Sequence, residues 1–360
     1  MVFLLSLVWY SSLAVITGYY LFIFRVRKTK DKVHWDSWPG VSVVIAIKNG
    51  TGKLRDTLLA LTRQDYPQYE IIIIDDYSAP DQWEALVQML NRLKGVFFYR
   101  SDRAPGKNHA LKMGIEKANH DFILCTDDDC LPAGPQWIKS MVSNANPGDI
   151  VLGYSPYIPQ PGRLNLFIRF ETVMTGMQYL SWAMLGKPFM GVGRNMLFSK
   201  SVLLKANFKH QLKKVGYGDD DLLVQSMKGK ASVKVSLDPE SFMYSEPAET
   251  LNEYIKQKHR HLSAGHYYSF VSWLQPGIFG IGIILHWFLL IPMLWCNVSI
   301  VFDLAFFAGV IIRWIGYASW AKRLGYPEMR WIYLGYEMMY AIYLAVVGVM
   351  TIFTERKTWN

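Results

Sequence analysis

The chain has 360 residues, of which 51% are apolar, 15% aromatic and 19% charged, and its 38 basic and 29 acidic residues give a formal net charge of +9. So much apolar surface excludes a disordered chain. The three cysteines, Cys125, Cys130 and Cys296, form no CxxC pair, which excludes a disulfide scaffold and a cysteine zinc site. Charged residues crowd the middle of the chain and are sparse at both ends, which argues against a protein made only of membrane helices.

The first segment in chain order, residues 1–24, contains no charged residue. As a helix it would be about 36 Å long, which is enough to cross a bilayer. We interpret it as a transmembrane anchor and not as a cleaved signal peptide, because no basic region precedes it and no A-x-A site ends it. Residues 25–40 form a basic juxtamembrane linker with Arg25, Arg27, Lys28, Lys30 and Lys32. The positive-inside rule then places the N-terminus outside and the following domain in the cytoplasm.

Residues 41–266 are predicted to form one α/β domain. Apolar, β-branched runs predict buried strands over 41–47, 70–74, 96–99 and 121–126, and helical spacing predicts helices over 53–64, 82–93 and 107–118. Such alternation gives right-handed βαβ units and a mainly parallel sheet flanked by helices. Ligands of such sheets bind beyond the carboxyl ends of the strands.

Residues 163–185 stand out within this domain because they carry only Arg163, Arg169 and Glu171 among large apolar side chains. One interpretation is a helix that lies in the membrane interface beside the active site. The other is a core helix of the domain, and the sequence leaves both open.

Three further apolar segments are predicted to be transmembrane helices, over 277–298, 304–320 and 331–353. The loop from 321 to 330 is basic, which suits the cytoplasm if four spans start with the N-terminus outside. Arg313 and Glu337 fall inside two of these spans. They indicate either a substrate path or a structural ion pair between neighbouring helices, and we favour the pair.

Polar and acidic residues follow three of the predicted strands. Lys48 and Asn49 follow the first strand, Asp75 and Asp76 the second, and Asp127, Asp128 and Asp129 the strand over 121–126. Carboxylates that converge on one edge of a sheet repel one another unless a cation or a donor-rich ligand offsets them. Acidic turns are also common after strands, but two in neighbouring βα units favour a metal or nucleotide site.

The sequence from Asp127 to Asp129 contains a D-x-D pattern. Mg²⁺ typically takes one or two carboxylates together with substrate phosphates, so this pattern is typical of a site for a metal-bound diphosphate. Lys107 opens a predicted helix, where its charge and the free backbone N–H groups can meet an anion. Neither a P-loop pattern nor a GxGxxG after the first strand occurs, which excludes the common nucleotide triphosphatase and Rossmann arrangements.

These segments and three later ones occur in an order that resembles the inverting family 2 glycosyltransferases of the GT-A fold, in the membrane-anchored bacterial branch. The matching stretches are 41–49 (VSVVIAIKN), 74–78 (IDDYS), 106–111 (GKNHAL), 126–132 (TDDDCLP), 191–196 (GVGRNM), 218–222 (GDDDL) and 257–261 (QKHRH). The family commonly has proline at Ala46, glutamate at Asp219 and tryptophan at His261, so the chain departs from its pattern at these positions.

The resemblance implies a role for each matching residue. Asp220 would be the catalytic base that deprotonates the acceptor, with Asp219 beside it. The nucleotide-sugar would bind to Ala46, Lys48, Asn49, Asp75, Asp76, Lys107, Asp127 and Asp128. A divalent metal, Mg²⁺ or Mn²⁺, would bind to Asp127 and Asp129. Asn195, Gln257 and Arg260 would lie near the acceptor and the diphosphate.

The implied activity is transfer of a sugar from a nucleotide-diphospho-sugar to a lipid-linked or surface glycan, by a single inverting displacement. The alternative is a processive polysaccharide synthase. His261 in place of tryptophan and only four spans favour transfer of one or a few sugars. A non-catalytic transporter or scaffold fits less well, because the D-x-D, Lys107 and Asp220 are all present. We expect a multi-pass protein of the bacterial inner membrane whose basic excess faces the lipid bilayer, and no nucleic-acid partner, since no nucleic-acid-binding motif occurs.

Overall fold

The structure is a computed structural model, and it describes residues 2–27, 32–50, 52–103, 105–205, 219–296 and 299–353. The described residues divide into two compact units. We call residues 2–27, 159–185, 248–296 and 299–353 the helical unit, and residues 32–158, 186–205 and 219–247 the sheet unit.

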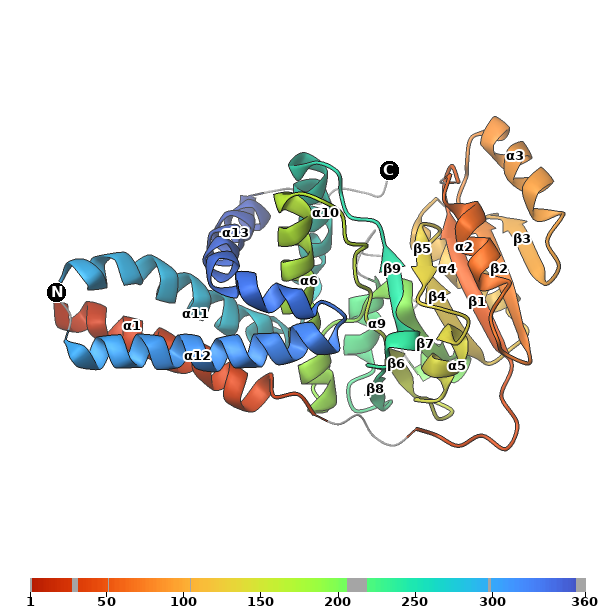
Figure 1. Ribbon diagram of the computed structural model, residues 1–360. Coiled ribbons are helices and arrows are strands. Elements are labelled where there is room, and N and C mark those ends of the chain that lie inside the picture. The colour runs from red at the N-terminus through yellow and green to blue at the C-terminus, as the bar shows by residue number, and fades with distance from the viewer. Residues whose placement is uncertain are drawn as a thin grey trace. The chain divides into compact units, whose positions relative to one another are not determined.

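The sheet unit is built on a seven-stranded sheet in the order β3-β2-β1-β4-β7-β6-β8 (Figure 1). Its strands are β1 (Val41–Ile47), β2 (Tyr69–Asp75), β3 (Val96–Arg100), β4 (Phe122–Thr126), β6 (Ile150–Leu152), β7 (Met196–Ser199) and β8 (Val233–Val235). Strands β3, β2, β1 and β4 are parallel, whereas β7 is antiparallel to both of its neighbours. The predicted α/β class with a mainly parallel sheet is confirmed.

Shorter elements complete the sheet unit. Its helices are α2 (Leu54–Leu61), α3 (Pro80–Leu90), α4 (Lys107–Lys117), α5 (Trp137–Val142), α7 (Lys200–Lys205) and α9 (Asp219–Ser226), with the 3-10 turns η2 (Gly193–Asn195) and η3 (Pro239–Ser241). A second, two-stranded sheet pairs β5 (Cys130–Pro132) with β9 (Met243–Ser245). Strand β5 follows the acidic turn directly, so it fixes the far end of that turn.

The central strands are buried on both faces, which is why they read as continuous apolar runs. Val43, Ile45, Ile71 and Ile73 belong to one core cluster with apolar residues of α2, α3 and α5. Helix α4 packs against the opposite face, where a Cβ added at Gly114 would lie 2.5 Å from Val44 Cγ1. Gly114 therefore lets α4 approach the sheet closely, and α4 begins at Lys107.

Glu70, at the start of β2, is buried far from the acidic edge of the sheet and accepts hydrogen bonds from Ser42 Oγ at 2.6 Å, from Asn119 N–H at 2.6 Å and from Asn119 Nδ2 at 2.7 Å. Burial alone would raise its pKa, but these donors outweigh burial and lower it. A carboxyl group whose pKa is lower in the folded than in the unfolded state stabilises the fold at pH values above its ordinary pKa. This stabilisation is lost as the pH falls through the pKa of the folded state. We expect Glu70→Gln to lower the free energy of unfolding by about 1–3 kcal/mol at neutral pH.

Thermal unfolding of Glu70→Gln in detergent, followed from pH 7 down to pH 3, checks this prediction. The difference in unfolding free energy between wild type and variant should shrink on acidification. A difference that is constant with pH would show that the carboxylate charge of Glu70 contributes nothing.

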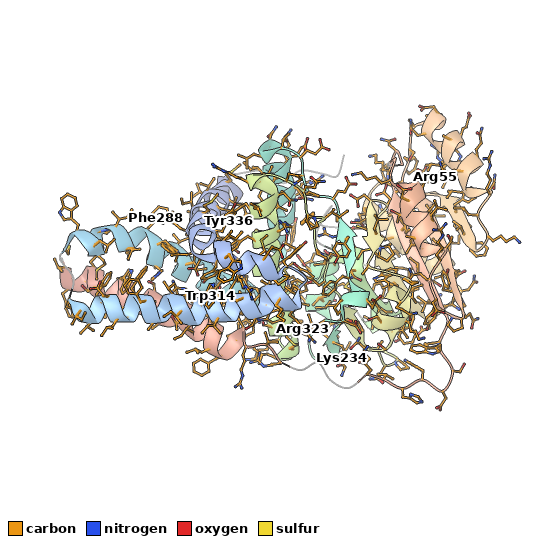
Figure 2. The ribbon with its side chains drawn as sticks, in the orientation of Figure 1. Arg55, Lys234, Phe288, Trp314, Arg323 and Tyr336 are labelled. Carbon is orange, nitrogen blue, oxygen red and sulfur yellow. The ribbon has the colours of Figure 1, made fainter. Side chains whose placement is uncertain are left out.

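The helical unit contains the apolar segments of both chain ends. Its elements are α1 (Val2–Gly18), η1 (Tyr19–Ile23), α6 (Arg163–Met184), α10 (Leu251–Ser263), η4 (Ala264–Tyr267), α11 (Phe270–Trp295), α12 (Ile300–Arg323), η5 (Pro327–Ile332) and α13 (Tyr333–Phe353). Figure 1 shows α1 beside α11 and α12, and the packing of their side chains agrees. Outward side chains such as Phe288 on α11 are exposed (Figure 2), as expected for helices that face lipid.

Four helical stretches are long and apolar enough to cross a membrane: Val2–Ile23, Phe270–Trp295, Ile300–Arg323 and Pro327–Met350. The prediction of one N-terminal and three C-terminal apolar helices is therefore confirmed. The boundaries differ, because the stretch predicted over 277–298 begins at Phe270 and contains Pro276. A membrane helix tolerates proline where neighbouring groups satisfy the freed carbonyl. The helix α11 therefore continues through Pro276 and does not begin after it.

Arg313 and Glu337 form the ion pair that the sequence left as one of two interpretations. Arg313 Nε lies 3.2 Å from Glu337 Oε1, and neither side chain is exposed. Arg313 also contacts His286 Nε2 at 3.2 Å, and Tyr333 donates a hydrogen bond to Glu337. These contacts join α11, α12 and α13, so the ion pair and its hydrogen bonds hold the three helices together within the helical unit.

Helix α6 shows how the structure differs from the predicted domain boundaries. The stretch 163–185 and helix α10 lie inside the predicted domain 41–266, yet both pack in the helical unit. Most residues of α6 are buried, and its charges are paired: Glu171 with Lys258 of α10 at 2.5 Å and Arg169 with Glu328 of η5 at 2.7 Å. The two charges of α6 thus contact helical elements of the same unit, and the position of 163–185 in a membrane interface stays a prediction.

Candidate active site

The order in which strands are added to the sheet reverses at β1. The loops after β1, β2 and β4 therefore lie at one edge of the sheet. From β1 the chain adds β2 and β3 on one side and returns to add β4 on the other. Ile47 pairs with Asp75 of β2, and Ile45 pairs with Thr126 of β4, so the carboxyl ends of these parallel strands lie at the same edge of the sheet. Ligands of open α/β sheets bind at such a switch point. The residues after β1, β2 and β4 therefore form the candidate site.

The loop after β4 carries the predicted metal ligands. Asp127, Asp129 and Cys130 each offer one ligand atom, and these atoms lie within 4.8 Å of one another. Lys107 Nζ lies 2.5 Å from Asp127 Oδ1, while Asp128 between the two carboxylates is half-buried. Burial, and then the charge of Asp127, raises the pKa of the Cys130 thiol, and this thiol donates to Asp129 at 3.3 Å. Two nearby carboxylates are the oxygen donor set that suits a divalent cation.

Asp75 is the last residue of β2 and Asp76 follows it, and both carboxylates are fully buried. Asp75 accepts the Ser78 N–H at 3.2 Å and lies 3.6 Å from Arg100 Nε. Both oxygens of Asp76 accept the Gly106 N–H, at 2.9 and 3.0 Å, and burial raises the pKa of Asp76. The two side chains thus hold together the loops after β2 and before α4. Their contact with a nucleotide base stays a prediction.

The loops after β1 and β2 contain strained backbone. Asn49 and Tyr77 have positive φ angles of 61° and 59°. The Asn49 N–H donates to Ser78 Oγ at 2.6 Å, which ties one loop to the other. Non-glycine residues in this conformation are uncommon and gather at functional sites. Ala46 is buried within β1, and Lys48 is half-buried and close enough for its charge to act on Asp76.

Asp220, the predicted base, lies at this same edge. Gly193 N–H donates to Asp220 Oδ2 at 2.6 Å, and a Cβ at Gly193 would lie 3.1 Å from the same oxygen. Burial raises the pKa of Asp220, while the Gly193 hydrogen bond and the Lys107 charge lower it and the Asp127 charge raises it. Residues nearly 100 positions apart in the sequence are thereby brought into one electrostatic group.

The two neighbours of Asp220 differ from it. Asp221 is buried and accepts the Gly191 N–H at 3.1 Å, so it attaches α9 to the segment 191–196. Asp219 is the first residue of α9, and its side chain lies outside the part of the chain that the structure describes. Within the acidic run, Asp220 is close enough to Lys107 and Asp127 for their charges to act on it.

Arg194 and Asn195 lie together on the turn η2. Asn195 is fully buried, and its amide accepts from Trp137 Nε1 at 3.1 Å and donates to Tyr154 O at 2.8 Å and to Ser241 O at 2.9 Å. Its polar groups hold the loop, and its contact with the acceptor stays a prediction. Sequence reasoning missed Arg194, although it is the only charged residue of the segment 191–196, which was the available signal.

Gln257 and Arg260 lie on α10, in the helical unit. Arg260 is exposed and Gln257 is half-buried. Their predicted places near the diphosphate and the acceptor stay predictions.

Comparison with known proteins shows what part of the chain is similar to. Residues 42–205 match the family model described as glycosyl transferase family 2. The chain is 23% identical over 270 residues to the poly-beta-1,6-N-acetyl-D-glucosamine synthase of Staphylococcus aureus (strain MSSA476), covering 69% of this chain and 60% of that protein. It is 25% identical over 246 residues to the synthase of the same name from Staphylococcus epidermidis, covering 63% of this chain and 55% of that one. The chain thus spans about 60% of the length of the curated relatives that it matches.

Among solved structures, a mannosyltransferase from Pyrobaculum calidifontis in complex with GDP-Man and Mn²⁺ superimposes with a TM-score of 0.58 at 14% identity. The superposition covers 97% of this chain and 99% of that one. At this identity the likeness concerns the fold, and it supports the predicted GT-A-type arrangement.

Proposed function

We propose that this chain, which contains a glycosyl transferase family 2 domain at residues 42–205, transfers a sugar from a nucleotide-diphospho-sugar to a membrane-associated acceptor with inversion at the anomeric carbon. The observation that carries this proposal is one electrostatic group: Asp127 pairs with Lys107, and both act on the charge of Asp220. The group combines cation ligands, a cation and a base at the edge where such sheets bind ligands.

On the donor side, negative charge grows on the nucleoside diphosphate as the glycosidic bond breaks. Asp127 and Asp129 would hold Mg²⁺ or Mn²⁺, which supplies charge stabilisation to that leaving group when bound. Lys107 is held by Asp127 at the start of α4, where its ammonium group and the helix N-terminus favour the phosphates.

On the acceptor side, the attacking hydroxyl must lose a proton as the new bond forms. Asp220 is fixed by the Gly193 N–H on one oxygen, so its carboxylate is oriented before the substrate arrives. A carboxylate with a raised pKa is a better proton acceptor near neutral pH. The site offers one base and no second positioned nucleophile among its described residues, which favours a single displacement.

A processive polysaccharide synthase is the second candidate, because the matched staphylococcal relatives bear the name of such synthases. The two candidates differ in product length. Incubation of the membrane-embedded protein with a panel of radiolabelled nucleotide-sugars, followed by gel separation, should give one or a few short products. A polymer ladder would establish the synthase instead, and no transfer from any donor would favour a non-catalytic protein.

We further propose that the protein is a multi-pass protein of the bacterial inner membrane with its sheet unit in the cytoplasm. Helices α1 and α12 run in the same direction, because Trp9 packs on Phe302 at 4.5 Å and Trp320 donates to the carbonyl of Phe24. Arg25 and Arg27 follow η1, which continues α1, and Lys322 and Arg323 lie in the last turn of α12, so these four cations lie at the same end of the two helices. A cationic end on the cytoplasmic side is what the positive-inside rule requires.

Thiol labelling tests this orientation. Cys296 is exposed at the C-terminal end of α11, which is antiparallel to α1, whereas Cys125 and Cys130 are buried. A membrane-impermeant maleimide should label Cys296 in intact spheroplasts. Lys322→Cys in a Cys296→Ser background should be labelled only after permeabilisation, and the reverse pattern would place the sheet unit outside.

A further inference from the structure

Arg194 is a cation of the candidate site to which no role has been given. It lies on η2, directly after Gly193, whose N–H holds Asp220. Its guanidinium carbon lies 5.1 Å from the centre of the Tyr157 ring, and its Nη2 donates to the carbonyl of Ser155 at 3.3 Å. The Tyr157 ring and the Ser155 carbonyl together fix the orientation of the Arg194 guanidinium.

Arg194 lies close enough to the acidic loop after β4 to interact with its charges. Asp127 and Asp129 are among the groups whose charges act on Arg194. Yet among the described residues neither carboxylate lies within ion-pair distance of it, and Asp127 pairs with Lys107 instead. The Arg194 Nε is buried and has no hydrogen-bond partner. A buried N–H without an acceptor is costly, so such a group in a site points to a ligand acceptor.

We propose that Arg194 binds the diphosphate of the donor, opposite Lys107 and beside the Asp127–Asp129 pair. This inference rests on the proposed function. A guanidinium presents several N–H donors in one plane and matches phosphate oxygens in a bidentate way. The charges of the carboxylates that would hold the divalent ion act on Arg194, and such an ion is shared with substrate phosphates. Arg194 is therefore a catalytic residue that stabilises the leaving group.

Nucleotide binding without acceptor tests the assignment. The full-length protein in detergent with Mn²⁺ is titrated calorimetrically with UDP and GDP and with the matching nucleosides. Arg194→Gln should weaken binding of the preferred diphosphate about 10–100-fold and leave nucleoside binding unchanged, because it removes hydrogen bonds to a charged group. Arg194→Lys should fall between wild type and Arg194→Gln, because it keeps the charge and the stem but loses the bidentate geometry.

The matched control is Arg55→Gln, since Arg55 is an exposed arginine on α2 of the same unit (Figure 2). It should bind the diphosphate as wild type does. Wild-type diphosphate affinity in both Arg194 variants, with equal unfolding temperatures, would overturn the assignment. So would an effect confined to the acceptor KM, which would move Arg194 to an acceptor phosphate. If wild type binds neither diphosphate, the proposed function and this inference fail together, whereas loss of the Arg194 effect alone leaves the proposed function intact.

Discussion

Asp129→Asn is expected to lower kcat/KM for sugar transfer by about 10³-fold. The substitution keeps the size of the side chain and removes the charge of one of the two carboxylates that lie within 4.8 Å of each other. Metal-ion charge stabilisation contributes several kcal/mol to such a transition state, and about 1.4 kcal/mol corresponds to a tenfold change in rate. Asp129 is the better of the two carboxylates to substitute. Asp127 also pairs with Lys107, so a substitution of Asp127 would remove this ion pair as well as a metal ligand.

Initial rates measured across a Mn²⁺ titration check this result. Wild type should lose activity with EDTA and regain it with Mn²⁺ or Mg²⁺, and Asp129→Asn should need far more metal for any residual rate. Asp81→Asn is the matched control, since Asp81 is an exposed aspartate in the first turn of α3. An Asp129→Asn protein with the full rate at the wild-type metal concentration would remove Asp129 from the metal site.

The sheet was predictable because its strands are buried on both faces. Continuous β-branched runs mark such strands, and the predicted 41–47 coincides with β1. The placement of α6 was not predictable, because a helix with few charges looks the same whether it packs on a sheet, on helices or at a bilayer. The partners of Arg169 and Glu171, from η5 and α10, show that α6 contacts other helices. Those partners lie 159 and 87 positions away in the sequence.

The candidate site was predictable where charged residues directly follow a strand or begin a helix. Asp127 and Lys107 were both expected at the acidic edge, and they form an ion pair there. The hydrogen bonds of Asn195 could not be predicted, because an amide in a motif shows its type but not the direction of its hydrogen bonds, which here go to Trp137, Tyr154 and Ser241. Arg194 was overlooked for the same reason: only the structure shows that its Nε lacks a partner.

Asp220→Asn is the second substitution with a large expected effect, a loss of about 10²–10⁴ in kcat, the usual contribution of a general base. Affinity for the nucleoside diphosphate should not fall, because Asp220 is assigned to the acceptor side. Asp221→Asn is the contrasting neighbour: its carboxylate is buried against the Gly191 N–H, so its loss should lower the unfolding temperature more than the rate per folded molecule.

The pH dependence and the stereochemistry of the wild-type reaction complete the test of Asp220. The base must be deprotonated to accept a proton, so activity falls as the pH drops through its pKa. Because burial raises the pKa of Asp220, this loss should begin at a higher pH than for an ordinary aspartate, whose pKa is about 4. NMR of the glycoside formed should show the anomeric configuration opposite to that of the donor. Retention would require a second nucleophile, and it would replace the single displacement and the role of Asp220 as its base.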